Sequence, residues 1–330
     1  MRSPSKALLA LVSGLTLLGG AAQAQRTISI GTLAPAGSTW IRGLESANRE
    51  LRRRSNQQLS IRFYAGGIQG DESEMIRKVR AGRLDGVVAT GIGLGNIHRP
   101  VLAFMLPGMF DSQASVERAR ASLDTEVQQQ FSSHGFSLIS WAVGGMPRLF
   151  STMPIRTPSD LAGAHPWLWR DDVILPAFYR EAGATGVPLA LPEVLGALQT
   201  NRINALVAPP YAAVALQWAS RMTHMTEGAN SYSVGGIVLS NRAYQGLPAE
   251  QQTLLREVIQ QFNGLIQRNV DRDDRNAITS LTRRGVQLVQ YTPAERTQWN
   301  GLFDRARRRL IGTVSDEAWM TRVRNAGRSR

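Results

Sequence analysis

The alternation of short apolar runs with amphipathic segments is the feature that most restricts the fold of this chain. From Trp141 to Trp218, apolar stretches of strand length alternate with segments whose apolar residues recur at helical spacing. This order predicts an α/β fold, with a parallel sheet covered by helices in this region. Ligands of such open sheets lie beyond the carboxyl ends of the strands.

The segment that precedes this region shows the same alternation. Strands are predicted over 27–32, 60–64 and 84–90, with a helix between each pair; Gly70-Asp71-Glu72 opens the second helix. The glycines at 91, 93 and 95 suggest a dinucleotide loop, but Asn96 stands where G-x-G-x-x-G requires its third glycine. We therefore interpret the glycine segment as a flexible turn after the strand.

The later part of the chain returns to the first lobe. A strand over 235–240 and a very long helical pattern from Pro248 to about Arg284 follow the central region. We expect a two-lobe fold, each lobe a sheet flanked by helices, with a long inter-lobe helix and several crossovers. Lobe I comprises 25–144 plus about 235–275, and lobe II comprises 145–234 plus about 276–330.

The N-terminal 24 residues have the pattern of a signal peptide. Arg2 and Lys6 precede an apolar run over 7–18 that is too short to span a bilayer, and Ala22-Gln-Ala24 supplies small residues for cleavage near Ala24. We therefore expect a periplasmic protein. The chain has no cysteine, which excludes disulfides and a lipid-anchored cysteine.

The charge of the chain does not predict nucleic-acid binding. The formal net charge is +13, but the arginines cluster at 52–54, 305–309 and 322–330 without interleaved aromatic residues that could stack on bases. Solvated helix faces account for these clusters better.

No enzyme motif is present in the sequence. G-x-S-x-G and H-E-x-x-H are absent, and there is no cysteine nucleophile. The four histidines are scattered, which argues against a zinc site, and Asp171-Asp172 is interpreted as a loop ion pair or as helix N-terminal charge. We expect no catalysis, no cofactor and no metal.

Several motifs together resemble one family of transport receptors. The motifs are GDESEMIRKVRAGRLDGVVATG from Gly70, LPGMFDS from Leu106, TPSDLAG from Thr157, LPEVLGALQTNRINAL from Leu191, and the long helix after SNRAYQGLPAEQQ. In this order and spacing the chain is similar to the C4-dicarboxylate-binding (DctP-like) extracytoplasmic receptors of tripartite ATP-independent periplasmic (TRAP) transporters. The resemblance implies a two-lobe receptor that closes on one small molecule and delivers it to integral membrane subunits.

The resemblance also identifies positions where this chain diverges from the family. Members usually hold a carboxylate with an arginine on the strand after the DLKG turn, where this sequence has Trp167. A second family arginine matches Arg148, a family asparagine corresponds to Ala208, and an acid beside the third strand corresponds to Thr90. Glu72 occupies a position where an acidic or polar contact occurs.

These replacements leave two kinds of solute open. In the first, Arg148 or Arg170 holds the carboxylate of an organic acid whose body is apolar or aromatic. In the second, an uncharged aromatic or lipid-like solute lies in a mostly apolar cleft lined by Trp167, Trp169, Tyr211 and Trp141. Arg148 could instead pair with Asp160, and Trp218 is interpreted as core. The candidate ligand-binding residues are Arg148, Trp167, Trp169, Arg170, Glu72, Thr90, Leu191, Ala208 and Tyr211.

A function outside transport also fits the pattern. A sensory or scaffold module could bind a solute and report it to a partner protein without delivering it. Ligand-linked closure of the two lobes distinguishes a hinged receptor from a module with a fixed cleft.

Overall fold

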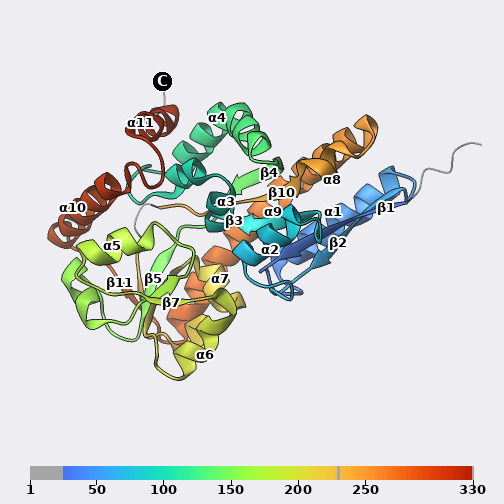
Figure 1. Ribbon diagram of the computed structural model, residues 1–330. Coiled ribbons are helices and arrows are strands. Elements are labelled where there is room, and N and C mark those ends of the chain that lie inside the picture. The colour runs from blue at the N-terminus through green and yellow to red at the C-terminus, as the bar shows by residue number, and fades with distance from the viewer. Residues whose placement is uncertain (1–24, 229–230, 329–330) are drawn as a thin grey trace, which may run out of the picture.

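The computed structural model describes residues 25–228 and 231–328 (Figure 1). The predicted signal peptide, residues 1–24, lies outside the described residues. Within the described part of the chain, no helix is long and apolar enough to cross a membrane.

The first sheet has five strands in the order β2-β1-β3-β10-β4. Strand β1 pairs in parallel with β2 and β3, whereas β10 is antiparallel to both β3 and β4. The sheet is therefore mixed, because the strand that returns from the later part of the chain enters in the opposite direction. The bounds are β1 (Arg26–Thr32), β2 (Leu59–Tyr64), β3 (Gly86–Thr90), β4 (Phe136–Val143) and β10 (Val234–Ser240).

Helices α1, α2 and α4 flank this sheet. Each begins at a side-chain cap, respectively Ser38, Asp71 and Ser112, which accepts a hydrogen bond from a backbone N–H of the first turn. The bounds are α1 (Thr39–Arg54), α2 (Glu72–Arg80) and α4 (Gln113–Ser133).

The second half of the molecule contains a smaller mixed sheet. Its four strands have the order β11-β9-β5-β8, and β5 is antiparallel to both of its neighbours. This differs from the expected parallel sheet of the central region. Parallel strands β6 and β7 form a separate pair, and a bridge from Pro166 to Ala205 joins it to β8. The bounds are β5 (Arg148–Ser151), β6 (Trp167–Trp169), β7 (Val187–Leu189), β8 (Ala205–Ala208), β9 (His224–Thr226) and β11 (Gln287–Val289).

The long helix predicted from Pro248 is present as α9 (Ala249–Arg283), with 35 residues. It packs against α1 and β4 near the first sheet and against α7 (Pro210–Ala215) in the second half. Side chains of α9 therefore reach both parts of the molecule.

The last two helices pack on different parts of the fold. Helix α10 (Pro293–Leu310) starts at a capping box formed by Thr292 and Glu295, and it packs on α5 (Leu175–Glu181). Helix α11 (Glu317–Ala326) packs on α4 and on η1 (Arg99–Met105). The range of about 276–330 is expected to belong to lobe II, whereas α11 within it packs on elements in the range expected for lobe I.

The glycine segment after β3 is a helix rather than the expected flexible turn. Helix α3 (Gly91–Ile97) forms because its glycines admit close neighbours. A methyl group on Gly93 would collide with the carboxylate of Glu72, and one on Gly95 would lie 2.7 Å from Leu102 Cγ. The helix is thus fixed by packing that glycine alone permits, which outweighs the low helix propensity of glycine.

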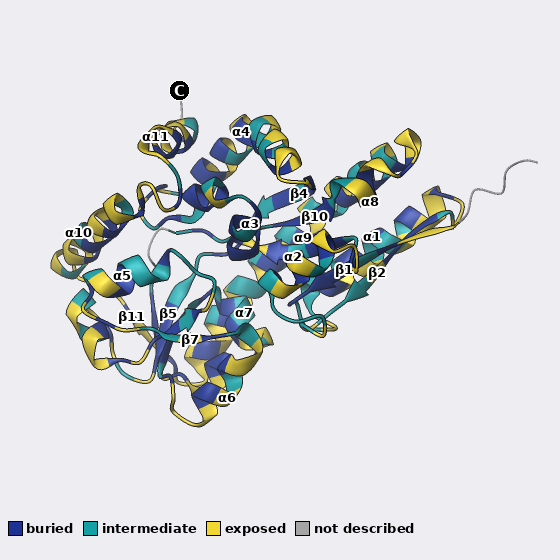
Figure 2. Ribbon diagram, in the orientation of Figure 1, coloured by how far each residue is buried: buried dark blue, intermediate teal, exposed yellow. Residues whose placement is uncertain are grey.

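The buried residues form two apolar clusters. One lies between β1, β2, α1 and α9; the other extends from β3 and α4 into the second half of the chain. Figure 2 shows buried strands inside and exposed outer helix faces. Arg52, Arg53 and Arg54, at the end of α1, are exposed. These arginines are solvated, as their clustering suggests.

Candidate functional site

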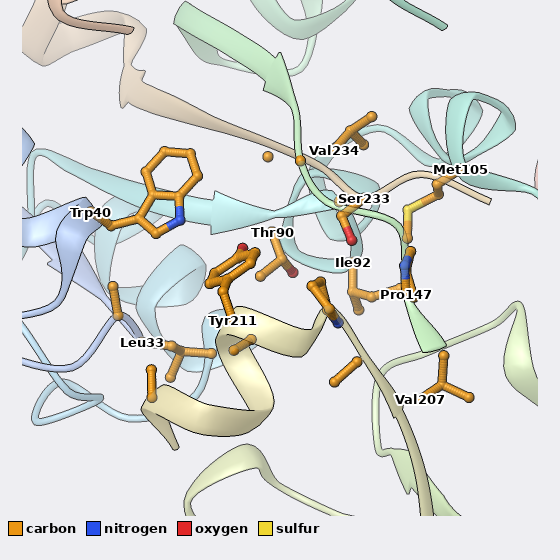
Figure 3. Close-up of a pocket in the computed structure, with 18 of the residues that line it drawn as sticks. Leu33, Trp40, Thr90, Ile92, Met105, Pro147, Val207, Tyr211, Ser233 and Val234 are labelled. Atoms are coloured by element: carbon orange, nitrogen blue, oxygen red, sulfur yellow. The ribbon is translucent and has the colours of Figure 1, made fainter. Parts of the chain in front are cut away.

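A cavity of about 710 Å³ lies between the two parts of the molecule. It is bordered by the ends of β3, β4 and β10 from the first sheet and by β6, β8 and α7 from the second half. In Figure 3, Thr90, Ser233 and Val234 lie across the cavity from Tyr211, with Trp40 and Leu33 at one end and Met105 and Pro147 at the other. This volume is typical of a small-molecule site.

The first-sheet wall of the cavity contains several glycines. Gly91, Gly144, Gly235 and Gly236 all line it, and each is closely packed from behind. A methyl group on Gly236 would lie 2.6 Å from the backbone oxygen of Ser140, and methyl groups on the other three glycines would also contact neighbouring atoms. Glycine is therefore required for the shape of this wall.

The opposite wall is aromatic. The rings of Trp167 and Trp169 stack with their centroids 5.8 Å apart, and Trp218 meets Trp167 edge-on at 5.2 Å. The Trp167 Nε1 donates to the oxygen of Leu189 at 3.1 Å, so its polar atom is satisfied while its ring faces the apolar space. The arrangement suits an apolar or aromatic surface on a solute.

Glu72 is a buried acid that borders the cavity from the first sheet. Its carboxylate accepts hydrogen bonds from Thr90 N at 2.7 Å and from Thr90 Oγ1 at 2.8 Å. Burial raises the pKa of Glu72 to about 7, although the hydrogen bonds from Thr90 and from the Gly93 amide oppose the rise. Glu72 therefore joins the end of β3 to the start of α3, and both of its carboxylate oxygens already have partners.

Arg148 stands at the start of β5, beside the cavity. Its strand partner Ala208 and its sequence neighbours Pro147 and Leu149 line the cavity, whereas Arg148 itself is not among the lining residues. Its Nη1 donates to the backbone oxygen of Thr226 at 2.8 Å, and its buried Nε has no hydrogen-bond partner among the described residues.

The charge of Arg148 is only partly compensated. Desolvation lowers the pKa of Arg148, and the nearby acids Asp274 and Glu227 offset only part of this effect. Asp274 accepts a hydrogen bond from Tyr211 N at 3.0 Å, and burial raises the pKa of Asp274. Asp160, by contrast, accepts hydrogen bonds from the backbone of Arg156 and Thr157.

Arg170 lies outside the cavity. It is exposed and pairs with Glu193 at 3.2 Å, as a solvated ion pair. The strand turns outward after Trp169, so the side chain of Arg170 is directed to solvent. The predicted residues that the structure does bring to the cavity wall are Glu72, Thr90, Trp167, Trp169, Leu191, Ala208 and Tyr211.

Several lining residues were not singled out from the sequence. Trp40 stands in the first turn of α1, and no motif around it indicates a ligand contact. Trp218, interpreted as core, is buried and also lines the cavity. Trp141 packs away from the cavity and donates to Asp124 at 2.6 Å. Asp172, interpreted as a loop charge, also borders the cavity; burial raises its pKa to about 6.

The sequence matches a known receptor family over most of its length. The model of the bacterial extracellular solute-binding proteins, family 7 (DctP), matches residues 30–311. The chain belongs to this family. Family 7 is a family of solute receptors rather than of enzymes, and the described residues hold no group of three or more His, Asp or Glu side chains placed to bind a metal.

Individual family 7 proteins are similar to this chain at low identity. A solute-binding protein of Verminephrobacter eiseniae is 24% identical over 273 residues, which cover 81% of this chain and 80% of the relative. A TRAP periplasmic solute-binding protein of Desulfovibrio salexigens, solved with orotic acid, has a TM-score of 0.85 at 17% identity and covers 91% of this chain and 98% of its own. One of Shewanella oneidensis, solved with succinate, has the same TM-score at 17% identity, with coverage of 92% and 100%.

Proposed function

We propose that this family 7 protein is the periplasmic receptor of a TRAP transporter and that it binds a small organic acid with an apolar or aromatic body. The cavity between the two halves is the binding site, and closure of the halves around the solute precedes delivery to the membrane subunits. The relatives solved with orotic acid and succinate support a carboxylic acid as the solute class.

The observation that carries this proposal is the incompletely paired Arg148 beside a cavity whose lining is mostly apolar. A desolvated guanidinium whose neighbours only partly offset its desolvation is stabilised when an anionic solute enters. The aromatic wall opposite the glycines supplies apolar contact for the rest of the solute. Arg148 is thus proposed as the carboxylate partner, with Trp167, Trp169 and Tyr211 around the body.

Calorimetric titration of the purified protein tests this assignment with matched solutes. The acids are succinate, orotate and 3-phenylpropanoate, and 3-phenylpropanol is the uncharged counterpart of the last. We expect 3-phenylpropanoate to bind at least tenfold more tightly than the alcohol, because a hydrogen-bonded charge pair contributes about 1.5–3 kcal/mol.

Arginine variants identify the residue that holds the carboxylate. Arg148→Ala is expected to weaken acid binding at least about tenfold. Arg170→Ala is the control for loss of an exposed arginine and is expected to leave affinity unchanged. Equal affinity for the acid and the alcohol, unaffected by Arg148→Ala, would instead support a receptor for uncharged apolar solutes.

A further inference from the structure

The indole of Trp169 connects the aromatic wall to the opposite side of the cavity. Its ring lines the cavity from β6, and its Nε1 donates to Asp71 Oδ2 at 2.9 Å. Asp71 caps α2, which packs on the first sheet, whereas β6 belongs to the second half. The bond therefore spans the two parts between which the cavity lies.

The same carboxylate receives further backbone donors. Leu191 N lies 3.4 Å from Asp71 Oδ2, while Asp71 Oδ1 accepts the N–H of Glu72 at 2.8 Å. One oxygen of Asp71 thus holds its own helix, and the other faces the donors of the second half. This division separates the capping role of the residue from its contact across the cavity.

We propose that Asp71 and Trp169 form a latch that holds the two halves closed and fixes the aromatic wall in place. Trp169 is 8% exposed and Asp71 is half-buried, so the bond to the carboxylate is partly shielded from water, which strengthens it relative to a bond on the surface. Separation of the halves breaks the bond and moves the Trp169 ring, with the rest of the aromatic wall, away from the first-sheet side of the cavity. Trp169 is then a positioning residue, because it sets the population of the closed form as well as contacting the solute.

This inference rests on the proposed receptor function, because closure matters only if a solute is enclosed. It also makes a statement about specificity. A solute whose apolar body touches both the Trp169 ring and the first-sheet wall makes a pair of contacts that exists only in the closed form, and such contacts shift the population toward closure. A compact acid that does not reach the ring lacks this additional stabilisation.

The variants separate the latch from simple packing. Trp169→Phe keeps an aromatic ring and removes the N–H donor. Asp71→Asn retains one side-chain oxygen, which can cap α2. The NH2 group of the asparagine then faces the Trp169 N–H, so two donors meet where the parent protein has a donor and an acceptor. Trp218→Phe is the matched control, because Trp218 also packs on Trp167 and lines the cavity but its Nε1 donates to no other described residue.

The test measures the distance between the two halves in the absence of any solute. The chain has no cysteine, so Arg77→Cys on α2 and Gln199→Cys on α6 (Val194–Gln199), both exposed, can be spin-labelled uniquely. Double electron–electron resonance then reports the ratio of short to long distances. Hydrogen exchange of the peptide that contains Leu191 detects open forms that are too rare for the first method.

We expect Trp169→Phe and Asp71→Asn each to lower the closed-to-open ratio about tenfold, with a non-additive double variant, while Trp218→Phe leaves the ratio unchanged. Because a change in closure acts on every solute equally, Trp169→Phe should weaken binding of succinate, by no more than the factor by which it lowers the ratio. The latch is refuted if Trp169→Phe, Trp218→Phe and the parent protein all show the same distance distribution and the same hydrogen-exchange rates. That result leaves the solute class untouched, which the acid and alcohol titrations decide separately.

Discussion

Glu72 gives a prediction whose size follows directly from its burial. The pKa of its carboxyl rises from 4.5 to about 7 in the folded protein, chiefly because burial disfavours the charged form. The folded state therefore binds the proton more tightly than the unfolded state. The corresponding stability is fully present below pH 4.5 and is lost as the pH rises through about 7, a loss of about 3 kcal/mol.

The Glu72→Gln variant removes this pH dependence because its side chain stays neutral. The glutamine amide also places an NH2 donor where the carboxylate has an acceptor near Gly93. This changes the free energy of unfolding by an amount that does not vary with pH. Urea unfolding followed by tryptophan fluorescence, at intervals from pH 4.5 to pH 8, measures both effects. We expect the stability of the parent protein to fall by about 3 kcal/mol relative to the variant across this range.

The difference between the two curves isolates Glu72 from other titrating groups. Asp172, with a pKa of about 6, and Asp274, with a raised pKa, contribute to the pH dependence of both proteins and cancel. Glu74→Gln, an exposed substitution on the same helix, is the control and should give a curve parallel to the parent. Parallel curves for the parent and Glu72→Gln would refute the argument that burial sets the proton affinity of this carboxyl.

Two further substitutions, each with its own control, test how the elements around the cavity are supported. Gly93→Ala should lower the free energy of unfolding, measured in urea, by more than 1 kcal/mol, because the added methyl meets the Glu72 carboxylate. Its control is Gly196→Ala in α6, which has open space around it and should raise the free energy of unfolding by up to about 1 kcal/mol. An equal effect of the two would remove the packing argument for α3. Thr292→Ala should cost about 1 kcal/mol in the same assay through loss of the α10 capping box, and Thr297→Ala on the exposed face should cost less.

The sequence predicts the elements that local chemistry controls. Helix α10 begins after Thr292 because its capping box is complete in the sequence, and α9 follows Pro248 because its apolar residues repeat over many turns. The α/β class and the receptor family follow from such local patterns taken in order. The parallel sheet expected for the central region is wrong, because β5 pairs antiparallel with both β8 and β9, and strand direction depends on where the chain returns.

The cavity shows the limits of reading residues without their packing. Helix propensity argues against a helix at the glycines of α3, and the close packing of Gly93 on Glu72 and of Gly95 on Leu102 explains why these positions are glycine in a helix. Trp167, Trp169 and Tyr211 line the cavity, where strand periodicity and the family resemblance direct them. Arg170 lies outside because its orientation depends on the turn after β6, which the amino-acid pattern does not specify.

The glycine wall has a consequence for how this receptor can acquire a different solute. Substitutions at Gly235 or Gly236 strain the sheet before they reshape the cavity, since each added methyl on β10 meets a backbone oxygen of a neighbouring strand. The aromatic wall consists of side chains whose exchange leaves the backbone in place. Changes of preference, whether by natural drift or by laboratory selection, are therefore expected to accumulate on the tryptophan side while the opposite surface stays constant.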